Sequence, residues 1–304
     1  MDIIVPTGKI RIVLDATLYT SFQACDEQFR LKHILNLVPM SGMGKAIEKG
    51  SMMHHILETF YKAKKAGKDR NDRLQAAVNT GQTYITGCEH CIANACLIHK
   101  DNSFKGPQSI TIDDGHDVIN TFQQYEEFWK NDSWTTLEVE HVKGKVIYED
   151  DELSLLWKAK CDWIVDTDVD FGISVDHKTA SRRDDVSSLD NQFIGQCIVN
   201  NQLKMYRNVI GYQTSLKPHE KFTREAVNYT KSRIAEWTLE TASYAYDLAA
   251  VLDSQRFRHR FTSCRRRFGD CIFRHVCEGE PEDRQRLLNE KFKVSDRIWD
   301  ISND

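Results

Sequence analysis

Apolar side chains recur every three to four residues over several long stretches of the chain, which is the spacing of a helix with one buried face. The clearest stretch is 44–66, where apolar and charged residues fall on opposite faces and Gly67 marks the end. The same spacing predicts further helices over 18–36, 70–99, 115–130, 189–211 and 229–252.

The pattern changes in the middle of the chain, where apolar and polar residues alternate one by one. This alternation, rich in Val, Ile, Leu and Trp, predicts strands over 135–149, 153–166 and 171–177, with a short strand over 9–14. Strands and helices together predict an α/β fold with a central mixed β-sheet flanked by helices. We expect a single domain over 1–304, in which 70–130 forms a helical insertion or subdomain.

The composition and charge of the chain indicate which classes of protein to expect. No run of 18 apolar residues occurs, and the first residues lack the basic start and apolar stretch of a signal peptide. We therefore expect a cytoplasmic protein without a membrane partner. The net charge of −4 does not favour nucleic acid by itself, but 256–267 holds six arginines. We expect these arginines and the aromatic residues between them either to contact DNA or to form a solvated loop. The residues are Arg256, Arg258, Arg260, Arg265, Arg266 and Arg267, with Phe257, Phe261 and Phe268.

Two carboxylates and an amine occupy neighbouring predicted strands. Asp162 lies in LWKAKCDWIVD, and Asp176 and Lys178 lie in FGISVDHKT. Side chains two residues apart on a strand share a face, so all three can reach one point. Oxygen ligands suit Mg²⁺ or Mn²⁺, and a lysine can stabilise charge that develops on a phosphate. The alternative is an ordinary exposed strand, where Asp and Lys prevent edge pairing.

A histidine pair on the helix 44–66 offers a further ligand. His54 and His55 both lie in GSMMHHILE, and the pattern alone does not choose between them. Gly50, one turn before His54, permits close approach of backbone or substrate. Glu58, one turn after His54, is expected to share its face and to orient the imidazole. A structural histidine in the core is the alternative interpretation.

These motifs in this order resemble the PD-(D/E)XK nuclease superfamily, in particular its RecB-like branch of CRISPR-adaptation and phage exonucleases. GSMMHHILE, CDWIVD, VDHKTAS and a glutamine-bearing helix carry the resemblance. It implies a restriction-endonuclease-like core and metal ligation by His54, Asp162, Asp176 and the main-chain carbonyl of His177. It also implies catalytic roles for Lys178 and Gln192.

The activity implied by the resemblance is Mg²⁺- or Mn²⁺-dependent hydrolysis of DNA phosphodiester bonds. The substrate would be single strands or duplex ends, and the setting recombination, repair or replication in a phage or a bacterium, with proteins of those processes as candidate partners. One departure concerns Q-x-x-x-Y, a motif usual in this branch. Gln192 is present, but Gln196 stands where the tyrosine is expected.

Nine cysteines are many for a protein of a reducing compartment, where metal binding is the usual reason for clustering. Cys264, Cys271 and Cys277 are one ligand short of a tetrahedral site, and Cys25 is the candidate fourth. The resemblance implies a [4Fe–4S] cluster on these four residues, with the segment 256–280 closing onto the N-terminal helix. Zinc and free thiols are the alternatives.

A second group consists of Cys88, Cys91, Cys96 and His99. It predicts either a zinc site or small core residues, because all four fall on one stripe of the predicted helix. Cys161 and Cys197 are expected to be buried thiols.

Two other functions remain open. A catalytically silent DNA-binding or scaffold protein would keep the fold and the cluster, and a redox-responsive iron–sulfur protein would lack nuclease activity. The complete set of His54, Asp162, Asp176 and Lys178 favours a nuclease over both.

Overall fold

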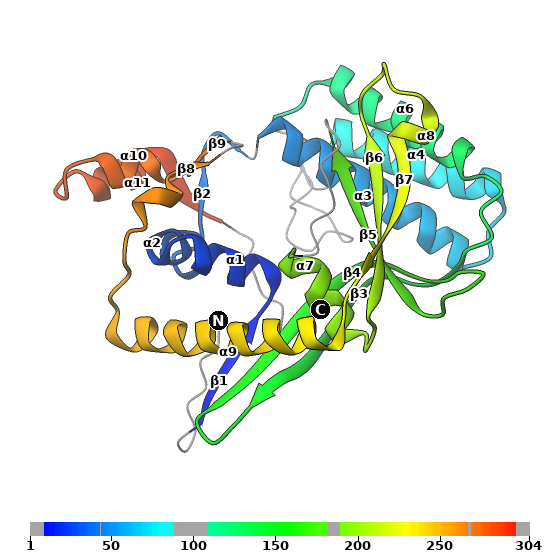
Figure 1. Ribbon diagram of the computed structural model, residues 1–304. Helices are drawn as coiled ribbons and strands as arrows, with labels where there is room; N and C mark the ends of the chain where they lie inside the picture. Colours follow the sequence, from blue (N-terminus) through cyan, green and yellow to red (C-terminus); the bar gives the residue numbers. More distant parts are fainter. Residues whose placement is uncertain (1–8, 43, 88–108, 181–188, 267–268, 296–304) are drawn as a thin grey trace.

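The structure is a computed structural model that describes residues 9–42, 44–87, 109–180, 189–266 and 269–295 (Figure 1). Within these ranges, no helix is both long and apolar enough to cross a membrane. The predicted central mixed sheet flanked by helices is confirmed. Its strands are β1 (Ile10–Leu14), β3 (Thr135–Glu149), β4 (Leu153–Asp166), β5 (Ile173–Ala180), β6 (Lys204–Gly211) and β7 (Phe222–Asn228).

Strand β4 is the centre of this sheet. The strand order is β1-β4-β5-β6-β7, and β3 pairs along the other edge of β4. The β1–β4 and β5–β6 pairs are parallel, and the remaining pairs are antiparallel. β1 pairs with 153–157 of β4, whereas β5 pairs with 163–165. The two strands thus leave a fork on one edge of β4, over 158–162.

Helices cover both faces of the sheet and form two cores. α3 (Lys45–Lys65), α4 (Arg70–Thr86) and α6 (Ile112–Phe128) pack around the end of β4 that carries Trp163. α1 (Ala16–Ala24), α7 (Asn191–Val199) and α9 (Lys231–Ser254) pack around the other end, at Trp157 (Figure 1). α7 fits into the fork because Gly195 has no Cβ, and any Cβ there would overlap the Trp157 indole.

The C-terminal part of the chain folds back onto the N-terminal part through short elements. It contains η2 (Phe261–Ser263), β8 (Arg265–Arg266), β9 (Gly269–Asp270), α10 (Arg274–Glu278), α11 (Arg284–Lys291) and β10 (Phe292–Val294). β10 pairs with β2 (Leu37–Pro39), and a small core joins α10 and α11 to Leu31. The other elements of the N-terminal part are α2 (Asp26–Phe29) and η1 (Arg30–Ile34). A separate short helix, α8 (Pro218–Lys221), precedes strand β7 of the central sheet.

Three predicted helices differ from the structure. The helix over 189–211 ends at Val199, and 204–211 is the buried strand β6; its apolar residues at 205, 206, 209 and 210 have the spacing of a helix, but both faces of the strand are buried. The helix over 18–36 is broken at Cys25, whose backbone is extended, with φ −171°. α4 ends at Thr86, before a glycine with φ +78°, and the remainder of the helix predicted over 70–99 lies outside the described residues.

Candidate metal centre

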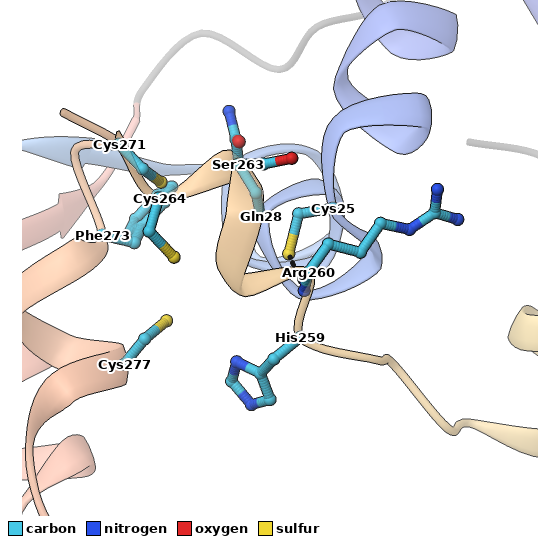
Figure 2. A pocket seen from close by; sticks show the side chains of 9 residues that line it. All are labelled: Cys25, Gln28, His259, Arg260, Ser263, Cys264, Cys271, Phe273 and Cys277. Atoms are coloured by element: carbon cyan, nitrogen blue, oxygen red, sulfur yellow. Dashed lines mark hydrogen bonds between the residues drawn. The ribbon is translucent and has the colours of Figure 1, made fainter. Parts of the chain in front are cut away.

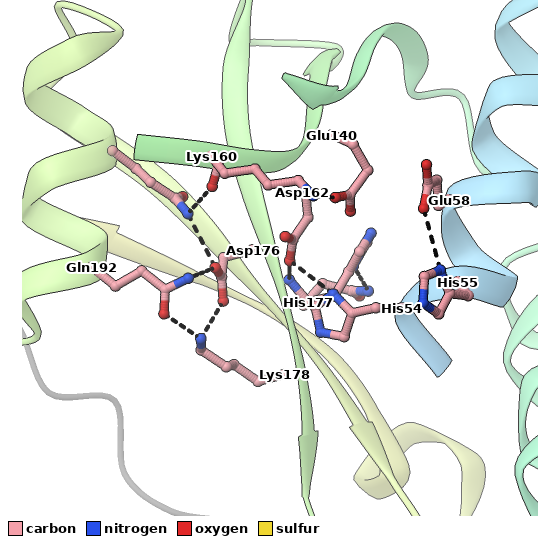
Figure 3. A network of polar contacts seen from close by, with 12 residues as sticks. His54, His55, Glu58, Glu140, Lys160, Asp162, Asp176, His177, Lys178 and Gln192 are labelled. Atoms are coloured by element: carbon pink, nitrogen blue, oxygen red, sulfur yellow. Dashed lines mark hydrogen bonds and ion pairs between the residues drawn. The ribbon is translucent and has the colours of Figure 1, made fainter. Parts of the chain in front are cut away.

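The fork in the sheet brings the predicted acidic residues together (Figure 3). Asp162 lies on β4, where the ladder to β5 has stopped, and its Oδ2 accepts a hydrogen bond from the His177 amide at 2.8 Å. The same oxygen lies 3.6 Å from Nδ1 of His54 on α3. The carboxylate thus takes the place of a ladder carbonyl and presents itself to the helix.

Glu140 on β3 is a residue that the sequence analysis missed. His54, Glu140 and Asp162 offer ligand atoms that all lie within 4.8 Å of one another. Glu140 lies across from Asp162, between two β3–β4 register pairs, and has a φ of +54°. A bulge between Val146 and Tyr148 shifts the register by one residue. Counting back from the predicted turn therefore does not place Glu140 opposite Asp162.

Asp176 lies on the α7 side of Asp162 and is fully buried. Its Oδ1 accepts hydrogen bonds from Nε2 of Gln192 at 2.6 Å and from Nε2 of Gln196 at 3.1 Å. Its Oδ2 lies 2.9 Å from Nζ of Lys178, which also donates to Oε1 of Gln192 at 2.6 Å. Gln192 thus bridges Asp176 and Lys178, and Gln196 supports Asp176 from the position where a tyrosine was expected.

Gln196 also completes the open edge of β4. Its Nε2 lies 3.2 Å from the carbonyl oxygen of Lys160, which lies in the fork between β1 and β5. Buried carbonyls require a donor, and here a side chain supplies it. One amide therefore ties α7 to β4 and to Asp176 on β5.

Burial and mutual repulsion dominate the electrostatics of the site. Burial raises the pKa of Asp162 well above its usual range, and the charges of Asp176 and Glu140 raise it further. Burial lowers the pKa of His54, so the imidazole is neutral and can act as a ligand. Burial opposes the charge of Lys178, but the neighbouring Asp176 outweighs it and raises the lysine pKa. A buried group of carboxylates with a neutral imidazole fits a divalent cation, whose charge removes the repulsion.

The two histidines of the α3 motif point in different directions. His54 faces Asp162, whereas Nδ1 of the half-exposed His55 lies 3.6 Å from Oε2 of Glu58. Glu58 also accepts a hydrogen bond from Lys62 at 2.6 Å, and its partners, His55 first, lower its pKa to about 2. The expectation that Glu58 orients His54 is therefore wrong, because its carboxylate turns to the neighbouring histidine.

The His177 side chain points away from the carboxylates. Its ring is buried between Tyr61 and Trp163, at centroid distances of 5.6 and 5.9 Å, and its Nδ1 lies 2.8 Å from Nδ2 of Asn208. Burial lowers its pKa well below the ordinary value. The ring thus anchors β5, while the main chain of the same residue faces Asp162.

Gly50 sets how closely α3 approaches β5. A Cβ on this residue would lie 3.0 Å from Oγ1 of Thr179, the residue after Lys178. This contact is tighter than ordinary van der Waals packing, so the glycine allows the helix to carry His54 to the strand.

The sequence profile of the PD-(D/E)XK nuclease superfamily matches residues 15–284, which is most of the chain and includes every residue of this centre. The chain belongs to the PD-(D/E)XK nuclease superfamily. Members of this superfamily are typically nucleases that depend on divalent metal ions, in agreement with the acidic and imidazole groups at the fork. A search of curated proteins found no match to the chain.

The four cysteines singled out in the sequence of this PD-(D/E)XK protein line one pocket (Figure 2). Cys25 comes from the junction of α1 and α2, Cys277 lies on α10, and Cys264 and Cys271 flank the β8–β9 hairpin. Burial and the neighbouring thiols raise the pKa of Cys277 to about 12 and also raise the pKa of Cys264. Four converging thiols fit a thiophilic metal group, because a bound cation stabilises their thiolates.

Two arginines of the basic segment secure this pocket. Nε of Arg258 lies 2.8 Å from Oδ2 of the buried Asp26, and Nη2 of Arg260 lies 3.2 Å from its Oδ1. The Arg260 amide also lies 3.4 Å from the Cys25 sulfur. In contrast, Phe261 is 72% exposed and its ring stacks on His259.

Several other predicted groups can be placed. Cys161 and Cys197 are buried, as expected. The possible zinc ligands Cys88, Cys91, Cys96 and His99 lie outside the described residues, as do Arg267 and Phe268.

Proposed function

We propose that this protein is a Mg²⁺- or Mn²⁺-dependent deoxyribonuclease that acts as an exonuclease on single strands or duplex ends. Its setting would be recombination, repair or replication of DNA in the cytoplasm of a bacterium or of a phage's host. The observation that carries the proposal is the convergence of His54, Glu140 and Asp162 beside the Asp176–Lys178 pair.

The residues at the fork would have different roles in hydrolysis. His54, Asp162 and Asp176 would hold the ion, together with Glu140 and the main-chain carbonyl of His177. When bound, the ion supplies Lewis-acid activation of the phosphodiester and of the attacking water. The Lys178 ammonium, held by Gln192, stabilises negative charge that develops on the phosphate and orients the water. The aromatic core around His177 keeps these groups in place.

The test is a cleavage assay with Mn²⁺ or Mg²⁺ on linear duplex, linear single-stranded and circular single-stranded DNA. We expect degradation of the linear forms and resistance of the circles, because an exonuclease needs an end. Asp176→Asn should reduce the rate by about 10³-fold or more, since metal activation is worth several kcal/mol.

The matched control is Asp170→Asn, which removes a carboxylate of the β4–β5 turn that pairs with Lys204 at 2.6 Å. It should leave the rate unchanged. Cleavage of circles would reject the exonuclease assignment. DNA binding without any metal-dependent cleavage would favour the silent DNA-binding protein.

We further propose that Cys25, Cys264, Cys271 and Cys277 hold a [4Fe–4S] cluster, as the RecB-like iron–sulfur nucleases would imply. The convergence of four thiols in one pocket supports this. Anaerobically purified protein should contain iron and acid-labile sulfide, and Cys277→Ser should lose both. Zinc without sulfide would instead indicate a tetrahedral zinc site.

A further inference from the structure

A second hollow lies beside the metal centre, between α1, η1 and the start of α7. Its volume is about 280 Å³, whereas a site for one water needs about 10–15 Å³. It therefore has room for a ligand much larger than water. We call it the α1–α7 groove and define it by the polar side chains that line it: Thr17, Thr20, Ser21, Lys32, Asp190 and Gln192.

The chemistry of the α1–α7 groove suits an oxygen-rich anion. Thr17 belongs to the first turn of α1, and Asp190 caps α7 by accepting a hydrogen bond from the Gln192 amide at 2.8 Å. The first turns of both nine-residue helices therefore border one space, and their amide N–H groups that Asp15 and Asp190 do not cap are donors for a ligand. The positive charge of Lys32 offsets the Asp190 carboxylate in this space.

Ser21 gives an independent indication of a ligand. It is only 6% exposed, and its hydroxyl has no hydrogen-bond partner among the residues that the structure describes. Buried hydroxyls are almost always satisfied, so a missing partner calls for a water or a ligand. This hydroxyl lies at the wall of the α1–α7 groove.

The α1–α7 groove adjoins both the metal centre and the cysteine pocket through residues that it shares with them. Gln192 lines it and at the same time contacts Asp176 and Lys178. Gln28 lines both the groove and the cysteine pocket. A polymeric substrate with one phosphodiester at the metal centre must place its neighbouring phosphates along such a surface.

We propose that the α1–α7 groove binds the sugar–phosphate backbone of one nucleic-acid strand next to the scissile bond and leads it from the metal centre toward the cysteine pocket. This inference rests on the proposed nuclease function. The groove offers hydroxyl, amide and main-chain donors and few apolar groups, so it reads the backbone and not the bases.

The test compares Lys32→Gln with Lys293→Gln, a control that removes one charge from the exposed strand β10. Binding of single-stranded DNA is measured by fluorescence anisotropy at several salt concentrations, in an Asp176→Asn background that prevents cleavage. We expect Lys32→Gln to raise Kd about three- to tenfold and to reduce the salt slope by about 0.7, which is the loss of one phosphate contact. Equal Kd and slope for the two variants would overturn the proposal.

Rates of hydrolysis on two substrates distinguish a failure of the groove proposal from a failure of the proposed nuclease function. Bis(p-nitrophenyl) phosphate has one phosphodiester and does not reach the α1–α7 groove, so Lys32→Gln should hydrolyse it as fast as the wild type does. On single-stranded DNA, KM should rise by the same factor as Kd while kcat stays constant. Failure of the wild type on both substrates would reject the nuclease function, whereas equal KM for both lysine variants would reject only the groove.

Discussion

The metal centre and the cysteine pocket are built by opposite means. The metal centre stands on long strands and on α3, within a large aromatic and aliphatic core. The cysteine pocket stands on short helices and a hairpin of two-residue strands, and the fully buried residues of its core are, within the described ranges, only Leu31, Phe273, Val276, Leu288 and Phe292. Apolar packing therefore preorganises the first site, whereas the second would depend on the metal group that we propose for its thiols.

The two sites also differ in how far apart their proposed ligands lie along the sequence. Asp162 and Asp176 lie on consecutive strands joined by a short turn, whereas Cys25 must meet thiols near the other end of the chain. Closing a longer loop costs more chain entropy. The cysteine pocket is thus expected to form after the sheet and to be lost before it.

The largest effect is expected from removing one thiol, which should disrupt the cysteine pocket and spare the metal centre. Cys277→Ser should abolish the bound metal group and unfold 256–295, because structural thiolate sites contribute on the order of 10 kcal/mol. Limited proteolysis should then cut this segment, while Mn²⁺-dependent hydrolysis of bis(p-nitrophenyl) phosphate persists. Cys197→Ala, at a buried thiol outside the pocket, should leave the segment resistant. Simultaneous loss of both sites would show that they are not independent.

A smaller effect is expected where α7 supports the metal centre. Gln196→Met keeps the side-chain length but removes the donor to Asp176 Oδ1, which should weaken Mn²⁺ binding about 10- to 100-fold. Calorimetric titration with Mn²⁺ measures this without substrate. The metal-free protein should also melt at a lower temperature, because the variant leaves the buried Lys160 carbonyl without the donor that Gln196 supplies.

Gln202→Met is the matched control for this change. Gln202 also has an unpartnered buried amide oxygen, but its Nε2 donates at 2.7 Å to the Gly172 carbonyl, in the β4–β5 turn. It should alter stability and not Mn²⁺ affinity. Equal Mn²⁺ affinities for the two variants would show that Gln196 only fills space.

The two sites are also expected to respond to pH in opposite directions. Burial lowers the pKa of His33 to about 4; this residue lies on η1, which packs against the cysteine-bearing C-terminal segment through Leu31. The unfolded chain therefore takes up the proton first, and stability is lost as pH falls from about 6.5 to about 4, by about 1–2 kcal/mol. Asp162 behaves in the opposite way, because its pKa is raised in the metal-free fold and stability falls as pH rises above about 4.

Denaturant titrations between pH 4.5 and 7.5 measure the histidine contribution. His33→Gln should flatten the loss of stability on the acid side, whereas His219→Gln, at α8, should not. An identical acid limb in His33→Gln would assign the loss to other groups.

The smallest effect is expected where α3 meets β5. Gly50→Ala favours the helix by about 1 kcal/mol but places a Cβ 3.0 Å from Thr179 Oγ1. The metal-free protein should keep its melting temperature, while kcat falls about two- to tenfold, because Lys178 moves with Thr179. Gly50→Ala/Thr179→Ala should restore kcat. A rate that stays low in the double variant would place the effect elsewhere on α3.

Proximity within one element followed from spacing, whereas contacts between elements were predicted only where the family resemblance supplied them, as for His54 with Asp162 and Cys25 with the C-terminal thiols. Spacing on one strand placed Asp176 and Lys178 together, and the order of the motifs identified the superfamily. Glu140 was missed because a bulge sets its register, and Glu58 was misassigned because side-chain direction decides between two neighbouring histidines. Strand β6 was taken for a helix because its apolar residues recur every four positions and do not alternate with polar ones.

The Asp162–His177 contact makes one main-chain amide a reporter of the metal centre. This N–H donates to a side-chain carboxylate and not to a main-chain carbonyl of the neighbouring strand, so its environment would change if that carboxylate bound a cation. Its nitrogen and proton chemical shifts should follow occupancy directly, and its exchange with deuterium should slow when a bound ion closes the fork. A single resonance of an unmodified protein can therefore count loaded molecules in the absence of DNA.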